Sequence, residues 1–267
     1  MSNTSNTEDV LGTLKDRLLG LHKPGIIYVH IPKTGGSSIS ASLRKHYRLS
    51  KFNIKSEVTS LAAQKRFGIV QSDPGYEEAL HQFRQSLIFH EAQKGTRYIT
   101  DHFWVDTNLL YLKPLGYRII TCLRNPVDRW FSQYFYGRYK DGSHGRIDQD
   151  IEEFLQTSRA ASYGTIYVRY LGGIRDDRDY TSRTAIQRAI DHLDMFDMVG
   201  FLDRLAEFHA WIKEDTGIIL RSEHRRRSPA TAAFRQKIKS SREFQNAVEK
   251  LCEPDAEVYE QAMRKFT

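Results

Sequence analysis

Residues 26–38, with the sequence IIYVHIPKTGGSS, combine an apolar run with groups suited to binding a phosphate or sulfate. The run 26–31 predicts a buried strand, and Pro32 ends it because proline cannot donate a hydrogen bond to a neighbouring strand. The two glycines let backbone N–H groups turn toward one point, and the serines begin a helix whose N-terminus attracts anions. The candidate anion ligands are Lys33, Thr34, Gly35, Gly36, Ser37 and Ser38.

The order of these residues separates the loop from that of ATP- and GTP-binding proteins, in which the lysine follows the glycines as G-x-x-x-x-G-K-[ST]. Here Lys33 precedes them. The order resembles the 5′-phosphosulfate loop of sulfotransferases that use 3′-phosphoadenosine 5′-phosphosulfate (PAPS). HIPKTGGSS is similar to the carbohydrate sulfotransferases related to the heparan sulfate 2-O- and 6-O-enzymes. The resemblance implies transfer of a sulfuryl group from PAPS to an acceptor hydroxyl.

A second segment supplies groups for a second phosphate. Residues 118–123 predict a buried strand, and Pro126 suits the first turn of a helix that follows. LRNPVDRWFSQY resembles the family pattern L-R-[DN]-P-x-x-R-x-x-S-x-Y, in which the arginine and the serine hold the 3′-phosphate of PAPS. The resemblance implies this role for Arg124 and Ser132, and a guanidinium fork fits phosphate well. Taken alone, these two would more often be ordinary surface residues.

A third segment, SEHRRRS at 222–228, is similar to the S-x-H-x-R-K-[ST] segment of 2-O-sulfotransferases. The resemblance implies that Arg226, Arg227 and Ser228 close over PAPS, although arginine replaces the usual lysine at 227. A solvated basic run before a helix that begins at Pro229 is the alternative. The closing helix 253–266 resembles the family's D-x-x-x-Y-x-x-A helix and is expected to be structural.

The catalytic groups follow from the reaction that the resemblance implies. Lys33 would stabilise the charge that develops on the departing phosphate oxygen, and a base must take the acceptor proton. His102 is the first candidate for the base, since it follows the predicted strand 97–100 and a neutral imidazole is available near pH 7. The family has a histidine at the comparable place. Asp101 could orient His102, act as the base itself or do neither, and a structural role for His102 also stays open.

Other chemistry-bearing residues are weaker candidates. His30 lies in the first strand, where packing or support of the loop is the better interpretation. His90 with Glu91 could also reach the cleft, although their spacing does not require it. The helix after Arg124 carries aromatic residues that are mostly core. Candidate contacts to an acidic acceptor are Arg138, Lys140 and Arg146, in a segment that could equally be a solvated loop.

The elements that position these residues predict an α/β fold. Strands at 26–31, 97–100, 118–123 and 197–202 alternate with helices, which favours a central parallel sheet flanked by helices. The resemblance implies that this sheet is P-loop-like and of the sulfotransferase type. Ligands of such sheets bind at the carboxyl ends of the strands, where all the site residues fall. We expect a disordered tail over 1–9 and a single domain over 10–267. The helix after the phosphate loop should bury Ile39, Leu43 and Tyr47.

The composition fits a basic enzyme. The chain has 267 residues, 40% hydrophobic content and a net charge of +7, which favours acidic partners. No nucleic-acid motif, membrane-spanning run or signal peptide is found, and the two cysteines indicate a reducing compartment. These features lead us to expect a cytoplasmic protein. The resemblance implies PAPS as co-substrate and a glycan or similar hydroxyl acceptor, and we expect no metal. The alternatives are a P-loop phosphotransferase and a non-catalytic binder of nucleotide or acidic glycan.

Overall fold

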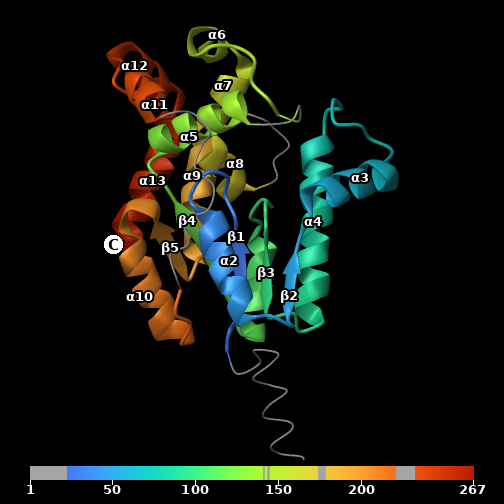
Figure 1. Ribbon diagram of the computed structural model, residues 1–267. Coiled ribbons are helices and arrows are strands. Elements are labelled where there is room, and N and C mark those ends of the chain that lie inside the picture. The colour runs from blue at the N-terminus through green and yellow to red at the C-terminus, as the bar shows by residue number, and fades with distance from the viewer. Residues whose placement is uncertain (1–22, 141, 143–144, 174–178, 221–231) are drawn as a thin grey trace, which may run out of the picture.

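The structure is a computed structural model that describes residues 23–140, 142, 145–173, 179–220 and 232–267 (Figure 1). Its centre is a five-stranded sheet in the order β2-β3-β1-β4-β5, and every neighbouring pair is parallel. The strands are β1 (Gly25–Val29), β2 (Lys51–Asn53), β3 (Tyr98–Asp101), β4 (Tyr117–Leu123) and β5 (Met198–Phe201). The predicted α/β fold is confirmed, and the four predicted strands are β1, β3, β4 and β5. The tail 1–9 lies outside the described residues.

One face of the sheet is covered by α2 (Gly36–His46) and α10 (Leu205–Thr216), which flank the sheet in Figure 1. Ile39, Leu43 and Tyr47 lie in this core beside Tyr28 and Cys122 of β1 and β4. The predicted apolar stripe after the phosphate loop is therefore confirmed. Cys122 and Cys252 are both buried, unpaired thiols.

The opposite face packs against α4 (Tyr76–Gln93) and a group of later helices. These helices are η1 (Thr107–Leu115), α8 (Ile166–Gly172), α9 (Arg183–Asp191), η2 (His192–Met195) and α13 (Glu253–Phe266). Residues of alternate parity along β1, such as Ile27 and Val29, enter this core, whereas Ile26 and Tyr28 enter the first one. Both faces of the sheet are buried, as expected for parallel strands.

The helix α5 (Pro126–Tyr139) begins with proline at its first position, as predicted, and Asn125 caps it by accepting hydrogen bonds from Val127 and Asp128 N–H. Its aromatic residues Trp130 and Phe131 are buried in a cluster with the small helices around it. The remaining helices are α3 (Ser56–Phe67), α6 (Ile151–Leu155), α7 (Ser158–Tyr163), η3 (Leu202–Arg204), α11 (Ala232–Lys239) and α12 (Arg242–Leu251). Within the residues that the structure describes, no helix is long and apolar enough to cross a bilayer.

Candidate active site

The loop between β1 and α2 has the backbone of an anion-binding turn. Lys33 has a φ of 69°, which is rare for a residue with a side chain, and Gly35 has a φ of 82°. The helix α2 has no side-chain cap and no acidic residue in its first turn. Because the first N–H groups of a helix lack intrahelical acceptors, this end of α2 is suited to bind an anion.

Thr34 has a different orientation from the other loop residues. Its side chain is fully buried, and its hydroxyl donates to the carbonyl oxygen of Ile31 at 3.0 Å. The side chain thus closes the turn from within and is not part of the cavity lining. Any contact of Thr34 with a phosphate would have to come from its backbone.

The His30 side chain packs against the loop between β1 and α2. A Cβ atom on Gly36 would overlap the His30 ring and lie 2.7 Å from the Tyr28 hydroxyl oxygen. The His30 ring is also stacked on Tyr28, with 5.8 Å between ring centroids. Only glycine at 36 lets the start of α2 lie this close to the strand that precedes it. This contact matches the loop-support role expected of His30.

The second segment that the sequence predicts to bind a phosphate is anchored at its backbone. Arg124 follows β4 directly, and its N–H donates to the Tyr167 hydroxyl at 2.9 Å, while that hydroxyl donates to the Arg124 carbonyl oxygen. Tyr167 lies on α8 and is fully buried. Ser132 lies on α5, on the helix that Asn125 caps. The Arg124 backbone is therefore fixed from two sides, by β4 and by α8.

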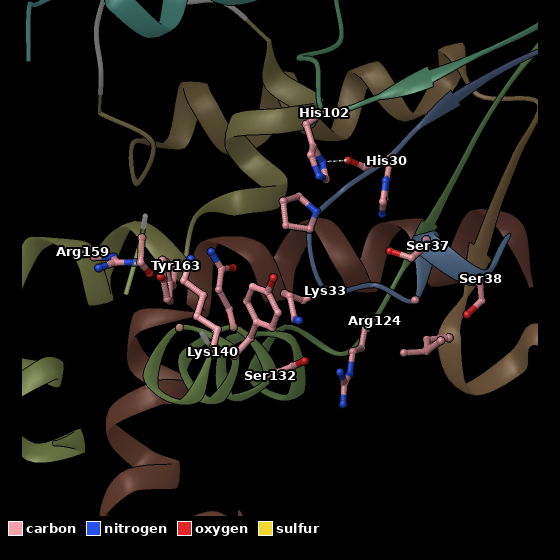
Figure 2. Close-up of a pocket in the computed structure, with 18 residues that line it drawn as sticks. His30, Lys33, Ser37, Ser38, His102, Arg124, Ser132, Lys140, Arg159 and Tyr163 are labelled. Atoms are coloured by element: carbon pink, nitrogen blue, oxygen red, sulfur yellow. Dashed lines mark hydrogen bonds between the residues drawn. The ribbon is translucent and has the colours of Figure 1, made fainter. Parts of the chain in front are cut away.

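The two segments border one cavity with a volume of about 450 Å³ (Figure 2). Of the residues predicted from the sequence, the cavity brings together Lys33, Gly35, Gly36, Ser37, Ser38, His102, Arg124 and Ser132. Arg226, Arg227 and Ser228 lie outside the described residues. Lys140 lines the same cavity, whereas Arg146 is half-exposed and forms an ion pair with Asp148 at 2.9 Å.

The Lys33 ammonium lies over an aromatic ring at the cavity wall. Its Nζ is 3.9 Å from the centroid of the Tyr136 ring, a distance at which a cation is attracted to the face of the ring. Tyr136 comes from α5, so the lysine reaches across from the first phosphate segment to the helix of the second. The flexible stem of lysine allows the ammonium to move from this ring to an anion in the cavity.

His102 has a defined tautomer. Its Nδ1 lies 2.5 Å from the His30 carbonyl oxygen, and a carbonyl can only accept, so Nδ1 carries the proton. In the neutral ring, Nε2 is then unprotonated and can act as a base. Burial lowers the pKa of His102, and the nearby Asp101 carboxylate opposes this effect in part. The imidazole is therefore neutral near pH 7.

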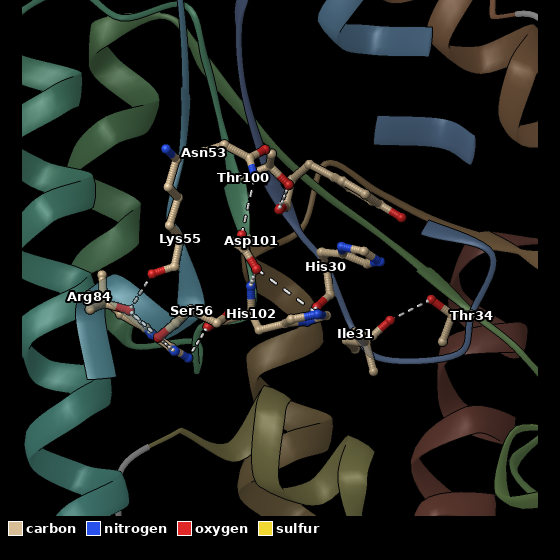
Figure 3. A network of polar contacts seen from close by, with 12 residues as sticks. His30, Ile31, Thr34, Asn53, Lys55, Ser56, Arg84, Thr100, Asp101 and His102 are labelled. Carbon is tan, nitrogen blue, oxygen red and sulfur yellow. Dashed lines mark hydrogen bonds and ion pairs between the residues drawn. The ribbon is translucent and has the colours of Figure 1, made fainter. Parts of the chain in front are cut away.

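Asp101 holds the loop that carries His102. Its Oδ1 accepts from the His102 backbone N–H at 2.6 Å and lies 4.0 Å from His102 Nε2, and its Oδ2 accepts from the Asn53 amide. The buried Arg84 of α4 donates to the His102 carbonyl oxygen at 2.7 Å (Figure 3). Because both carboxylate oxygens are engaged, the geometry favours the orienting role for Asp101 among the three left open by the sequence.

The other histidine candidates differ in position. Burial lowers the pKa of His30 to about 3, with a smaller contribution from His102, so His30 stays neutral beside the loop. His90 is exposed near the C-terminal end of α4, just before β3 begins, and thus at the opposite edge of the sheet from the cavity. It pairs with Glu91 at 3.4 Å and does not line the cavity.

Several residues of the site were not predicted from the sequence. Arg159 and Tyr163 of α7 line the cavity, and Arg159 donates to the carbonyl oxygens of Arg146 and Gly145. No pattern in the sequence connects α7 to the cavity. Arg159 and Tyr163 reach it because α6 and α7 pack against α5 in the folded chain. Gln133 also lines the cavity, and its position directly after Ser132 was the only available signal.

Comparison with known proteins places the chain in a family. The model of the family described as "Sulfotransferase domain" matches residues 23–183, which is more than half of the chain and includes both phosphate segments. The chain therefore belongs to the sulfotransferase domain family, whose members transfer sulfuryl groups. No curated protein matches the chain.

Among solved structures, the chain is similar to one from "Molecular and structural characterization of the PezAT chromosomal toxin-antitoxin system of the human pathogen Streptococcus pneumoniae". The two share 13% sequence identity over 97% of this chain and 98% of that one, with a TM-score of 0.36. A similarity this weak carries no argument about fold or function.

Proposed function

We propose that this protein is a PAPS-dependent sulfotransferase that acts on a hydroxyl of a carbohydrate or a similar small molecule. The observation that carries the proposal is the shared cavity, which the Lys33 loop borders on one side and Arg124 with Ser132 on another. PAPS bears phosphate at both its 5′ and its 3′ position, so it needs two separate anion sites. The N-terminus of α2 would bind the 5′ side, and Arg124 with Ser132 would bind the 3′-phosphate.

In the proposed reaction, the acceptor hydroxyl oxygen attacks the sulfur in line with the bond to the 5′-phosphate oxygen. The oxygen–sulfur bond to the acceptor forms as the bond to the phosphate breaks, and the acceptor proton passes to Nε2 of His102. The electron pair of the broken bond stays on the phosphate oxygen, where the Lys33 ammonium stabilises the growing charge. The products are the sulfated acceptor and 3′-phosphoadenosine 5′-phosphate.

The test is a thermal-shift comparison of 3′-phosphoadenosine 5′-phosphate with ATP and AMP. A ligand at 100 times its Kd stabilises the folded state by about 2.7 kcal/mol, which a melting curve resolves. We expect stabilisation by the 3′-phosphorylated nucleotide and loss of this effect in Arg124→Ala. Arg138→Ala, which removes the same charge from α5 outside the cavity lining, should retain it.

Three results would contradict the proposal. A larger shift with ATP would favour the P-loop phosphotransferase, and equal shifts in the two arginine variants would remove Arg124 from the donor site. Binding without any transfer from PAPS to a broad panel of hydroxyl acceptors would favour the non-catalytic binder.

A further inference from the structure

A second cavity, with a volume of about 280 Å³, lies beside the first one. The two cavities share His30, Ser37 and His102, so the proposed base belongs to the wall between them. The second cavity is formed by the carboxyl ends of β1, β2 and β3 together with one face of α2. Figure 3 labels His30, Asn53 and Asp101 at these strand ends. Its other lining residues are Ser40, Arg44, Asn53, Thr100 and Asp101.

The face of α2 toward this cavity is polar. Ser37, Ser40 and Arg44 line it at positions i, i+3 and i+7, which is the spacing of one helix face. Ile39 and Leu43 lie on the neighbouring, buried face of the helix. The hydroxyls deeper in the wall are already engaged, since Tyr98 donates to Ser40 and Thr100 donates to the Tyr28 carbonyl oxygen.

Arg44 provides the positive charge of this cavity. One guanidinium nitrogen donates to the Asn53 amide oxygen at 3.1 Å, and the Asn53 amide nitrogen donates to Asp101 at 3.2 Å. Among the described residues, no carboxylate forms an ion pair with Arg44. A guanidinium has five N–H donors, so Arg44 retains donors for a ligand while Asn53 fixes its orientation.

The size of the cavity limits what it can hold. Sites for drug-sized ligands span roughly 300–1,000 Å³, so a cavity slightly below this range suits a unit of about one sugar ring. An arginine fork binds carboxylate and sulfate with two parallel hydrogen bonds. A ligand with an anionic group and a hydroxyl on one ring could therefore contact Arg44 and His102 at the same time.

We propose that this second cavity binds the acceptor and that Arg44 selects acceptors carrying a carboxylate or a sulfate on the ring that bears the reactive hydroxyl. This inference rests on the proposed function, since it takes the first cavity as the donor site. The ring hydroxyl loses its proton to Nε2 of His102 and forms the bond to sulfur, and the 5′-phosphate of PAPS leaves with the electron pair into the first cavity. Arg44 binds the acceptor and takes no part in the bond changes.

The test measures binding of single sugars to the protein loaded with 3′-phosphoadenosine 5′-phosphate, by titration calorimetry. The probes are glucuronic acid and N-acetylglucosamine 6-sulfate, each compared with its neutral counterpart, glucose or N-acetylglucosamine. Hydrogen bonds to charged groups contribute enough to expect about tenfold tighter binding of at least one anionic sugar. Arg44→Gln should abolish this preference, and Arg44→Lys should retain only part of it.

Arg48→Gln is the matched control, because it removes the same charge from an exposed arginine that lines neither cavity. It should keep the preference of the wild-type protein. Equal binding of charged and neutral sugars, no binding of any of them, or a preference that survives Arg44→Gln would overturn the inference. If the nucleotide itself binds normally in those cases, the proposed function stands and only the acceptor assignment fails.

Discussion

The rings of His30 and His102 lie in contact, tilted by 31° with their centroids 4.6 Å apart, and the two histidines have different roles. The His30 ring fills the space under Gly36, and the His30 carbonyl oxygen sets the tautomer of His102. A single residue thus supports the phosphate loop with its side chain and orients the proposed base with its backbone. This division explains how a buried histidine with a pKa of about 3 can matter for catalysis without titrating.

The lowered pKa of His102 predicts how the transfer rate depends on pH. Because burial lowers the pKa of His102 below its ordinary value of 6.5, the base should stay unprotonated in mildly acidic solution. We expect the acid limb of the kcat/KM profile for transfer from PAPS to have its midpoint below pH 6.5. His102→Ala should lower kcat by about 100-fold or more while nucleotide binding persists.

The exposed His90 supplies the control, and His90→Ala should leave kcat and the pH profile unchanged. An acid limb centred at or above pH 6.5 would show that another group titrates. Equal losses of nucleotide binding and kcat in His102→Ala would assign the histidine a structural role.

The loop between β1 and α2 depends on close packing of α2 against β1. We expect Gly36→Ala to destabilise the protein by about 1–3 kcal/mol, the usual cost of overpacking, and to weaken nucleotide binding. The reason is that the new methyl group would displace the His30 ring or the first turn of α2. Urea unfolding and the thermal shift with 3′-phosphoadenosine 5′-phosphate measure the two effects.

Gly172→Ala is the matched control for this substitution. Gly172 ends α8, and an added Cβ would have no neighbour closer than 3.6 Å. This variant should be neutral or slightly stabilised, because alanine restricts the unfolded chain more than glycine does. A Gly36→Ala protein as stable as Gly172→Ala, with unchanged nucleotide binding, would mean that the loop accommodates the methyl group.

Local sequence patterns predicted those strands and helices whose ends are marked by proline, glycine or a capping residue. The strand, proline and double glycine around residue 32, and the strand followed by Asn125 and Pro126, can be interpreted without knowledge of the fold. The strand β2 was missed because it has only three residues and one half-buried side chain, so it has no apolar period of its own. It forms by pairing with β3, which is a tertiary effect.

The site residues that depend on tertiary contacts could not be predicted from the sequence either. The residues of the first cavity could be predicted where a motif places them at a strand end, as with Lys33 and Arg124. Arg44 was missed, although its spacing from Ser37 and Ser40 places all three on one helix face. Arg44 becomes a candidate ligand because Asn53 of β2 fixes its orientation through a hydrogen bond. This contact joins a helix to a strand that was not predicted, so it cannot be inferred from either segment alone.

The C-terminal helix α13 supports the proposed donor site through buried contacts. Asp255 of α13 is fully buried, and its Oδ1 accepts from the N–H groups of Tyr167 and Val168 at the start of α8. Tyr167 in turn holds the backbone of Arg124. The buried Arg129 lies near this carboxylate and donates to Gln133, which lines the first cavity.

The pKa of Asp255 predicts how stability depends on pH. Burial raises this pKa from 3.8 to about 7, and Arg129 opposes the shift. Between about pH 4 and pH 7 the folded state holds a proton that the unfolded state has released, so the contribution of Asp255 to the free energy of unfolding falls as pH rises. Asp255→Asn should remove this decline. The stability of the variant relative to wild type should therefore increase as the pH is raised from 4.5 to 7.5.

Urea unfolding at three pH values in this range tests the prediction. Glu260→Gln is the control, because Glu260 lies on the same helix with a carboxylate that is 66% exposed. It should change stability by a similar small amount at each pH. If the free energies of unfolding of wild type and Asp255→Asn changed in parallel with pH, the carboxyl group would not take up a proton on folding.

The support that Asp255 gives to Tyr167 also limits how far the protein can be shortened. The segment recognisable as a sulfotransferase domain ends at 183, yet β5 and Asp255 both lie beyond it. A fragment cut there would keep Lys33, Arg124 and Ser132 but would lose one edge of the sheet and the group that holds the first turn of α8. The part that identifies this chain and the part that must be produced to study it are therefore different lengths of polypeptide.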